Sequence, residues 1–347
     1  MPLRAKWTRV AVANSTKGVQ LARSSHCISV HNDKAVIAFG EHQPRDPVDS
    51  NLVTIDLHTG KLNVDSNERT PSKRVGAAWT RAPQGSDLFM WGGRGGKDMA
   101  TFSEETKGDK PEPRSFHVMT TSSDGNTLFV HAGCPAKGRL STLHSLSLAT
   151  LEWSERQSAP EPGRGGTNLT WLPNSNLLAR FGGFAGRELD GFDLYDTELD
   201  EWRSIETRSL LPDSSMPGKR SVTCLVPVDG NLRVNQDDND NKRIVAVMAH
   251  GERDPAPAEL GHDGSGFFHQ DVWALVAEND NDSRYTLKSQ WSWLKLEPTQ
   301  DSEKDQPEAR GWFASSFYKD NKILMHGGLN ANNERLDDAW ILEIVRE

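Results

Sequence analysis

The stretch RGGTNLTWLPNSNLLARFGGFAGRELDGFDLYDTELDEW, residues 164–202, contains one copy of the pattern that decides the fold. Arg164 precedes a segment of alternating apolar residues, and an apolar strand then ends at the glycine pair 182–183. A third apolar strand starts at Phe192, and a fourth ends near Trp202. Glycines at a strand end allow positive φ and the close approach of another backbone segment. The stretch therefore predicts four short β-strands with a turn at the glycine pair.

This pattern occurs six times along the chain, and each copy begins with an arginine. We name these residues the leading arginines: Arg23, Arg74, Arg114, Arg164, Arg220 and Arg310. Four short strands, a Gly-Gly signature and a period of about forty to fifty residues are typical of a kelch blade. The second copy is short, and the fifth is long because it contains several polar insertions. Six copies predict a propeller with six blades.

The two ends of the chain complement each other. The sixth copy has three strands and stops at Glu347, while a strand-like segment with its own tryptophan, Lys6–Val10, precedes the first copy. Pairing this segment with the last blade would close the ring and remove a free sheet edge. The expected fold is therefore all-β, a six-bladed kelch β-propeller closed by the N-terminal strand. We expect residues 1–347 to form one domain, with blades that start near the leading arginines.

Composition and charge exclude several classes of function. The net charge of −9 over 347 residues argues against nucleic acid and anionic membrane surfaces as partners. No window approaches the roughly eighteen apolar residues of a membrane span, and the start of the chain lacks the apolar segment of a signal peptide. The three cysteines are far apart and form no CxxC motif, which is typical of reduced thiols. We expect a cytoplasmic protein, either monomeric or a homodimer.

A long polar loop follows the apolar strand of the fifth copy. It spans residues 249–271 with the sequence AHGERDPAPAELGHDGSGFFHQD, and we call it the acidic loop. Loops of this length inside a compact domain are uncommon and often functional. Five titratable side chains lie between its glycines and prolines: Glu252, Asp254, Glu259, His262 and Asp263. Carboxylates and an imidazole can bind a divalent metal or move protons, and a solvated loop without a function is the alternative.

Segments at both ends and in the middle of the chain resemble one family. They are Trp7–Val10, Arg23–His26, Arg114–His117, Gly251–His262, Arg310–Phe313, Leu324–Leu329 and Asn333–Asp338. Over nearly its whole length the chain is similar to the plant specifier proteins, which include the epithiospecifier, nitrile-specifier and thiocyanate-forming proteins. The resemblance implies an Fe(II) ion at one face of the propeller, held by a Glu, an Asp and a His of the acidic loop. It also implies an arginine, just after a Gly-Gly pair, that binds the substrate's anionic group.

Two residues of the acidic loop match the implied metal ligands directly. Glu252 follows the strand-ending Gly251 and matches the family's Glu, and His262 matches its His. The family's Asp has no counterpart, because this loop is longer by two residues. Glu259 or Asp254 can replace it, since either offers a hard oxygen ligand suited to Fe(II) or Mn(II). The expected cofactor is Fe(II) or another divalent cation, and a metal-free acid/base site built from the same residues is the alternative.

Arg94 matches the family's anion-binding arginine, because it follows a Trp-Gly-Gly segment. We also assign substrate contacts to Arg23 and Arg114, since leading arginines at one point of each blade would make one mouth of the channel electropositive. The structural alternative is that each leading arginine hydrogen-bonds carbonyls or a carboxylate within the blades. Trp312 and Trp171 are expected to line the pocket, where indole faces stabilise a developing cation, and core packing is the alternative for both.

Nucleotide and flavin cofactors are not expected, since the sequence contains neither a P-loop nor a dinucleotide fingerprint. The expected function is that of a specifier-like enzyme of the lyase or isomerase type. It would steer the elimination, rearrangement or isomerisation of a reactive small molecule that an upstream enzyme of specialised metabolism delivers. The alternative is a kelch protein-interaction module without chemistry, which is the common use of the fold.

Overall fold

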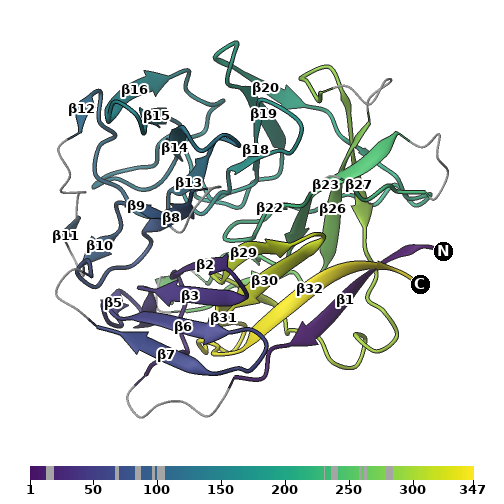
Figure 1. Ribbon diagram of the computed structural model, residues 1–347, viewed down its shortest axis with the longest axis horizontal. Helices are drawn as coiled ribbons and strands as arrows, with labels where there is room; N and C mark the ends of the chain where they lie inside the picture. Colours follow the sequence, from purple (N-terminus) through teal and green to yellow (C-terminus); the bar gives the residue numbers. More distant parts are fainter. Residues whose placement is uncertain are drawn as a thin grey trace.

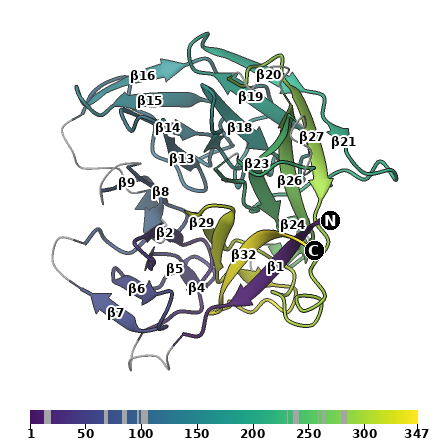
Figure 2. The same ribbon diagram turned by 45° about the vertical axis from the view of Figure 1, so that its right-hand side comes forward.

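The computed structural model describes residues 1–12, 19–66, 70–82, 87–95, 98–99, 106–229, 231–235, 241–257, 259–261, 264–278 and 284–347. Within these ranges the chain forms strands, bridges and turns, and no α-helix. None of the described residues belongs to a helix that is long and apolar enough to cross a membrane. Figures 1 and 2 show the sheets arranged around a common centre, as in a β-propeller. The predicted all-β class is confirmed.

Five sheets of four or five strands form blades. The first contains β2 (Cys27–His31), β3 (Lys34–Ala38), β6 (Leu52–Asp56) and β7 (Leu62–Asp65). The next contains β13 (Val118–Thr121), β14 (Thr127–His131), β15 (Leu143–Ser147), β16 (Glu152–Arg156) and the short β12 (Lys107–Gly108). It is followed by β17 (Thr170–Trp171), β18 (Leu177–Phe181), β19 (Phe192–Asp196) and β20 (Glu201–Ile205).

The remaining two large sheets contain the C-terminal half of the chain. One has β22 (Val226–Pro227), β23 (Lys242–Ala249), β26 (Val272–Glu278), β27 (Gln290–Lys295) and the short β21 (Arg208–Ser209). The other has β29 (Ala314–Lys319), β30 (Lys322–His326), β32 (Ala339–Arg346) and β1 (Leu3–Arg9). Three two-stranded ribbons follow glycine turns: β4 (Glu41–Gln43) with β5 (Asp46–Pro47), β10 (Arg94–Gly95) with β11 (Asp98–Met99), and β24 (Glu252–Asp254) with β25 (Phe267–Phe268). A fourth ribbon, β28 (Arg310–Gly311) with β31 (Leu329–Asn330), belongs to the sixth repeat.

A two-stranded sheet, β8 (Ala78–Arg81) and β9 (Leu88–Trp91), lies between the first two blades. Its strand β8 contacts β2 on one side and β13 on the other. The strands β13, β17, β22 and β29 then contact one another in chain order, and β29 contacts β2 and completes the circle. The structure thus has five large blades, and the predicted six blades are reached when this short sheet is counted as the sixth.

The N-terminal strand completes the last blade. It pairs antiparallel with β32, from Leu3 opposite Arg346 to Arg9 opposite Trp340. The two ends of the chain therefore lie side by side, as Figures 1 and 2 show. The predicted closure by the N-terminal strand is confirmed.

The leading arginines fix the glycine turn of their own repeats. In the fourth repeat, Nη1 of Arg164 donates to the Gly182 carbonyl over 3.0 Å. The same bond recurs in the pairs Arg23–Phe39, Arg74–Gly92, Arg114–Ala132, Arg220–His250 and Arg310–Gly327. Buried backbone carbonyls need a donor, and these lie where the strand ends. Each guanidinium supplies that donor.

The backbone carbonyl of each leading arginine also accepts a hydrogen bond from the preceding repeat. The donors are glycine N–H groups, in the pairs Gly40–Arg74, Gly93–Arg114, Gly133–Arg164, Gly183–Arg220, Gly251–Arg310 and Gly328–Arg23. These bonds are 2.8–3.0 Å long, and the last one links the sixth repeat to the first, so they form a closed circle. At Gly182, an added Cβ would lie 2.3 Å from the Arg220 carbonyl oxygen, so this close approach requires glycine.

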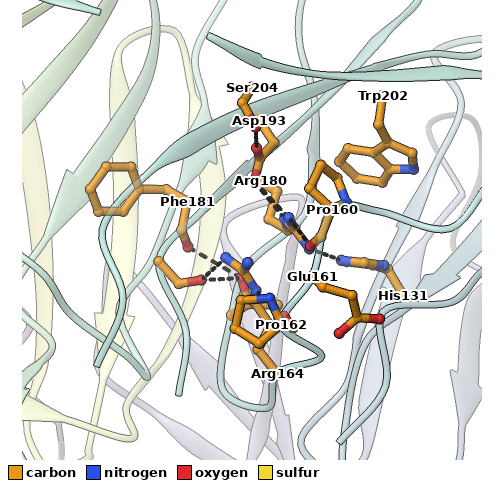
Figure 3. Close-up of polar contacts among 12 residues, drawn as sticks. His131, Pro160, Glu161, Pro162, Arg164, Arg180, Phe181, Asp193, Trp202 and Ser204 are labelled. Carbon is orange, nitrogen blue, oxygen red and sulfur yellow. Dashed lines mark hydrogen bonds and ion pairs between the residues drawn. The ribbon is translucent and has the colours of Figure 1, made fainter. Parts of the chain in front are cut away.

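Figure 3 shows a second buried arginine in the fourth repeat. Nε and Nη2 of Arg180 donate to Oδ2 of Asp193 over 3.0 and 2.6 Å, and Oδ1 of Asp193 accepts from the Ser204 hydroxyl over 2.6 Å. The Arg180 guanidinium also lies 5.2 Å from the Trp202 ring centroid and donates to the Pro160 carbonyl. Because its charge and its N–H groups are satisfied inside the protein, Arg180 belongs to the core and is not a candidate for ligand binding.

Trp7 anchors the closing strand in the core. Leu3, Ala5 and Trp7 are buried, at 8, 1 and 6 % exposed, while Lys6 faces solvent, as the two-residue period of a strand requires. The three buried side chains pack with residues of β23, β26, β30 and β32 between the last two blades. The Trp7 ring also lies 5.7 Å from the His250 ring, centroid to centroid.

We expect Trp7→Ala to lower the free energy of unfolding by about 3–5 kcal/mol, the usual loss when a buried tryptophan is truncated. Lys6→Ala, on the exposed face of the same strand, should change it by less than about 0.5 kcal/mol. Urea denaturation followed by circular dichroism measures both values. Equal effects of the two substitutions would contradict the closure of the ring by β1.

Candidate functional site

A cavity of about 530 Å³ opens at the face of the propeller where the glycine turns end, and we call it the mouth cavity. In each of the six repeats, the residue that directly follows the glycine turn lies in the wall of this cavity. These wall residues are Glu41, Arg94, Cys134, Phe184, Glu252 and Leu329. Backbone bridges to the residue after the leading arginine hold them in place, as in Val75 opposite Arg94 and Ser221 opposite Glu252. The repeat thus presents side chains of different chemistry at equivalent positions.

The floor of the mouth cavity is a second closed circle of six backbone hydrogen bonds. It joins the residues two positions after each leading arginine: Ser25, Gly76, Phe116, Gly166, Val222 and Trp312. All six have positive φ, between 46 and 62°, which is a rare conformation for a β-branched residue such as Val222. The Phe116 and Trp312 rings meet edge to face with centroids 5.5 Å apart. Residues that follow this floor circle line the central channel, so the circle lies between the mouth cavity and the channel.

Arg94 presents a charged group to the mouth cavity. Its Nε and Nη2 donate to the Ser115 hydroxyl over 3.0 and 2.5 Å, and its guanidinium lies 5.2 Å from the Phe116 ring centroid. Among the described residues, no carboxylate forms an ion pair with Arg94. The guanidinium therefore keeps N–H groups and charge for a ligand, in a geometry suited to bidentate binding of a sulfate or a carboxylate.

Three further arginines, Arg45, Arg139 and Arg335, line the same cavity. The Arg139 guanidinium lies 4.6 Å from the Phe184 ring centroid. Nη2 of Arg335 lies 3.8 Å from Oε1 of Glu41. Burial raises the pKa of Glu41, and the Arg45 N–H, Arg335 and Arg94 partly offset this rise. Because Arg94, Arg139 and Arg335 all line it, the cavity favours an anionic ligand.

Glu252 brings a buried carboxylate to the mouth cavity. It is the first residue of β24, and the residue is 7 % exposed. Pairing of β24 with β25 makes a ribbon of the acidic loop, with Glu252 opposite Phe268. Burial and then the nearby Glu188 carboxylate raise the pKa of Glu252 to about 8, and the Gly266 N–H partly offsets the rise. A carboxyl with this pKa needs either a proton or a cation to be stable at neutral pH.

The two other predicted carboxylates of the acidic loop, Asp254 and Glu259, do not join Glu252. The strand register shifts between Glu252 and Asp254, and the Asp254 carboxylate forms an ion pair with Nζ of Lys219 over 3.0 Å. Glu259 is exposed, and neither Asp254 nor Glu259 lines the mouth cavity. The structure therefore corrects the expectation that one of these two carboxylates replaces the family's Asp beside Glu252. His262 lies outside the described residues.

Three predicted substrate contacts lie elsewhere. Arg23 and Arg114 are 0 and 1 % exposed and bind backbone carbonyls, so their assignment to substrate binding is wrong and the structural alternative holds for both. Trp171, on β17, lines the central channel on the other side of the floor circle and packs against Phe129. It therefore does not share a pocket with Arg94. Trp312 does line the mouth cavity.

The sequence analysis missed Glu188, Arg139 and Arg335. Glu188 is 2 % exposed and acts on Glu252 electrostatically, and the two arginines line the mouth cavity. Each of the three stands shortly after the glycine turn of its repeat. This position is the signal that could have found them, because the loops that leave the glycine turns surround the mouth cavity.

Hard oxygen donors suited to a divalent cation are present at the fifth repeat. Glu252 and Glu188 are buried carboxylates, the donor type that Mg(II), Mn(II) and Fe(II) accept. Across the part of the chain that the structure describes, no three His, Cys, Asp or Glu side chains group closely enough to form a metal site by themselves. A cation held by these two residues would complete its coordination with water or substrate.

These features define a Kelch-repeat β-propeller with a polar cavity at one mouth. The chain belongs to the Kelch-repeats family described as the KLHDC2/KLHL20/DRC7 Kelch-repeats domain, which matches residues 25–234. It is 26 % identical over 385 residues to the N-(sulfonatooxy)prop-2-enimidothioate sulfolyase of Thlaspi arvense, and the match covers 99 % of this chain and 98 % of that protein. The resemblance to specifier proteins is thus confirmed. The structure of YjhT shares the fold with a TM-score of 0.60 and 14 % identity, over 94 % of this chain and 98 % of that one.

Two arginines of similar sequence context should respond differently to substitution. Arg114→Ala removes the donor of the buried Ala132 carbonyl and of the part-buried Glu112 carbonyl, and should lower the free energy of unfolding by at least about 2 kcal/mol. Arg94→Ala removes a partly exposed side chain that donates to one hydroxyl, and should lower it by less than about 1 kcal/mol. Urea denaturation compares them, and a large loss for both would show that Arg94 is structural.

Proposed function

We propose that this chain is a specifier-like lyase that acts on a small anionic molecule in the mouth cavity. The observation that carries the proposal is that Arg94, three further arginines and the buried Glu252 line one cavity, in a chain that aligns end to end with a sulfolyase. The name of that relative describes a substrate with a sulfonatooxy group. Guanidinium groups bind anions of this kind bidentately, so the charge of the cavity supports the proposal.

Arg94 is proposed to bind the anionic group of the substrate. Donors that point at the group on which negative charge develops stabilise the transition state of bond cleavage, and they do so more strongly where water is excluded. Arg139 and Arg335 would add positive charge around the same group. Arg94 is suited to this role because it leaves N–H groups unused, whereas the leading arginines use theirs on backbone carbonyls.

Phe116 and Trp312 are proposed to bind the organic part of the substrate. Their edge-to-face pair is the apolar part of the floor, opposite the opening of the mouth cavity. Aromatic faces stabilise a developing cation, and a packed floor keeps water away from a reactive intermediate. The cavity would thereby steer the elimination, rearrangement or isomerisation of an intermediate that an upstream enzyme supplies.

Fe(II) or another divalent cation is the proposed cofactor, and Glu252 is the described residue that would hold it. When bound, such a cation supplies positive charge that polarises the heteroatoms of a substrate. Glu252 would keep a hard oxygen donor fixed at the wall through the backbone bridge to Ser221. Arg94 would meanwhile orient the anionic group, so that one end of the substrate is fixed before any bond breaks.

Incubation with N-(sulfonatooxy)prop-2-enimidothioate tests the proposed function. Wild-type protein should change the product distribution relative to a protein-free blank, as measured by mass spectrometry. Arg94→Ala should lower kcat/KM by about 10–100-fold, the equivalent of one charge-assisted hydrogen bond or more. The matched control Arg203→Ala removes an exposed arginine of β20 and should leave kcat/KM unchanged.

The proposal fails if the products with wild-type protein equal those of the blank and the protein shows no saturable binding of the probe. That outcome would favour the interaction module without chemistry. Loss of activity in Arg203→Ala to the same extent as in Arg94→Ala would also remove the role assigned to Arg94.

A further inference from the structure

We propose that Glu188 and Glu252, two carboxylates from successive repeats, form a divalent-cation site beside the mouth cavity, with Glu252 in the cavity wall and Glu188 behind it. This inference deepens the proposed function, because it names residues that would hold the cation beside the substrate. The role of the cation in the reaction rests on the proposed function. Cation binding is measured without substrate, so either proposal can fail alone. Glu188 is the new element, since the resemblance to specifier proteins places the ligands in the acidic loop.

Glu188 is a buried carboxylate that lacks a partner. It follows β18 in a loop that folds back on itself, with Phe184 and Glu188 forming a backbone bridge. The residue is 2 % exposed, and neither carboxylate oxygen accepts a hydrogen bond from the described residues. The Ser221 side chain and Lys219 lie close enough to favour the ionised carboxylate. Burial opposes the ionised form, and a bound cation would stabilise it.

The backbone brings Glu188 and Glu252 to either side of Ser221. The Leu189 carbonyl, next to Glu188, accepts the Arg220 N–H over 2.9 Å. The following residue, Ser221, exchanges two backbone hydrogen bonds with Glu252, over 3.0 and 2.9 Å. Ser221 therefore lies between the two glutamates, which reach it from the fourth and the fifth repeat.

The Glu252 carboxylate is fixed in place on the side of the acidic loop. A Cβ added at Gly266 would lie 2.3 Å from Oε1 of Glu252, so the glycine leaves room for the carboxylate beside the backbone. Two buried carboxylates on either side of Ser221 match the hard-oxygen preference of Mg(II), Mn(II) and Fe(II).

The nearby Lys219 acts on Glu188 electrostatically, but its ion pair is with another carboxylate. Nζ of Lys219 lies 3.0 Å from Oδ1 of Asp254, and its side chain is half exposed. Nε of Arg253 also lies 2.8 Å from Oδ2 of Asp254. The side chains of Lys219 and Arg253 therefore both form their ion pairs with Asp254. Glu188 thus supplies, from the neighbouring repeat, the second carboxylate that Asp254 and Glu259 do not bring to Glu252.

Titration of the metal-free full-length chain with Mn(II) tests the site. Electron paramagnetic resonance counts free Mn(II), and wild-type protein should bind one Mn(II) per chain saturably. Glu188→Gln and Glu252→Gln should each weaken binding by at least about tenfold. The matched control Glu41→Gln removes another wall carboxylate, one that is paired with Arg335 and the Arg45 N–H, and should keep wild-type affinity for Mn(II).

Thermal melting shows that the variants are folded. Without metal, Glu188→Gln should melt at or above the temperature of wild type, because it removes an unpaired buried charge. Mn(II) should raise the melting temperature of wild type and of Glu41→Gln, and not that of Glu188→Gln. Equal Mn(II) affinity of wild type and Glu188→Gln, or no saturable binding by wild type, would overturn the site. If the Arg94-dependent reaction persists in that case, the proposed function stands without this cation.

Discussion

The fold depends on two hydrogen bonds that each leading arginine makes. Its guanidinium binds a carbonyl at the glycine turn of its own repeat, and its backbone carbonyl accepts a glycine N–H from the preceding repeat. The first bond fixes the turn within a blade, and the second fixes one blade against the next. Because the sixth link returns to Arg23, every repeat must meet the geometry that closes the circle. This constraint explains why arginine and glycine recur at equivalent positions.

The same constraint produces the mouth cavity. The residue after each glycine turn bridges to the residue after the leading arginine, and the next residue joins the floor circle. Wall and floor positions are therefore fixed by backbone hydrogen bonds, so their side chains can differ without changing the fold. Arg94, Glu252 and Trp312 occupy such positions. A scaffold of this kind can carry unrelated functions, because the chemistry is set by a few side chains at one mouth.

The sequence contained enough to predict the propeller and its closure, because both follow from local repeats and from the spare strand around Trp7. It also brought Arg94 and Glu252 to one site, since each follows a glycine turn. It did not reveal that Arg23 is buried, because the carbonyl that binds its guanidinium belongs to Phe39, which follows β3. Nor could it predict that Asp254 pairs with Lys219, because that contact depends on a register shift in the ribbon.

Repetition separates the structural residues from the functional ones. A residue type that recurs in every repeat serves what every repeat needs, and the leading arginines are bound to turn carbonyls in all six. Arg94 and Glu252 stand where other repeats have Cys134 or Leu329, so the blade does not require their charge. Glu188 is the clearest case, because burying a carboxylate that accepts no hydrogen bond from the described residues opposes folding. A residue that costs stability in one repeat alone is better explained by a function, and the proposed cation site is such a function.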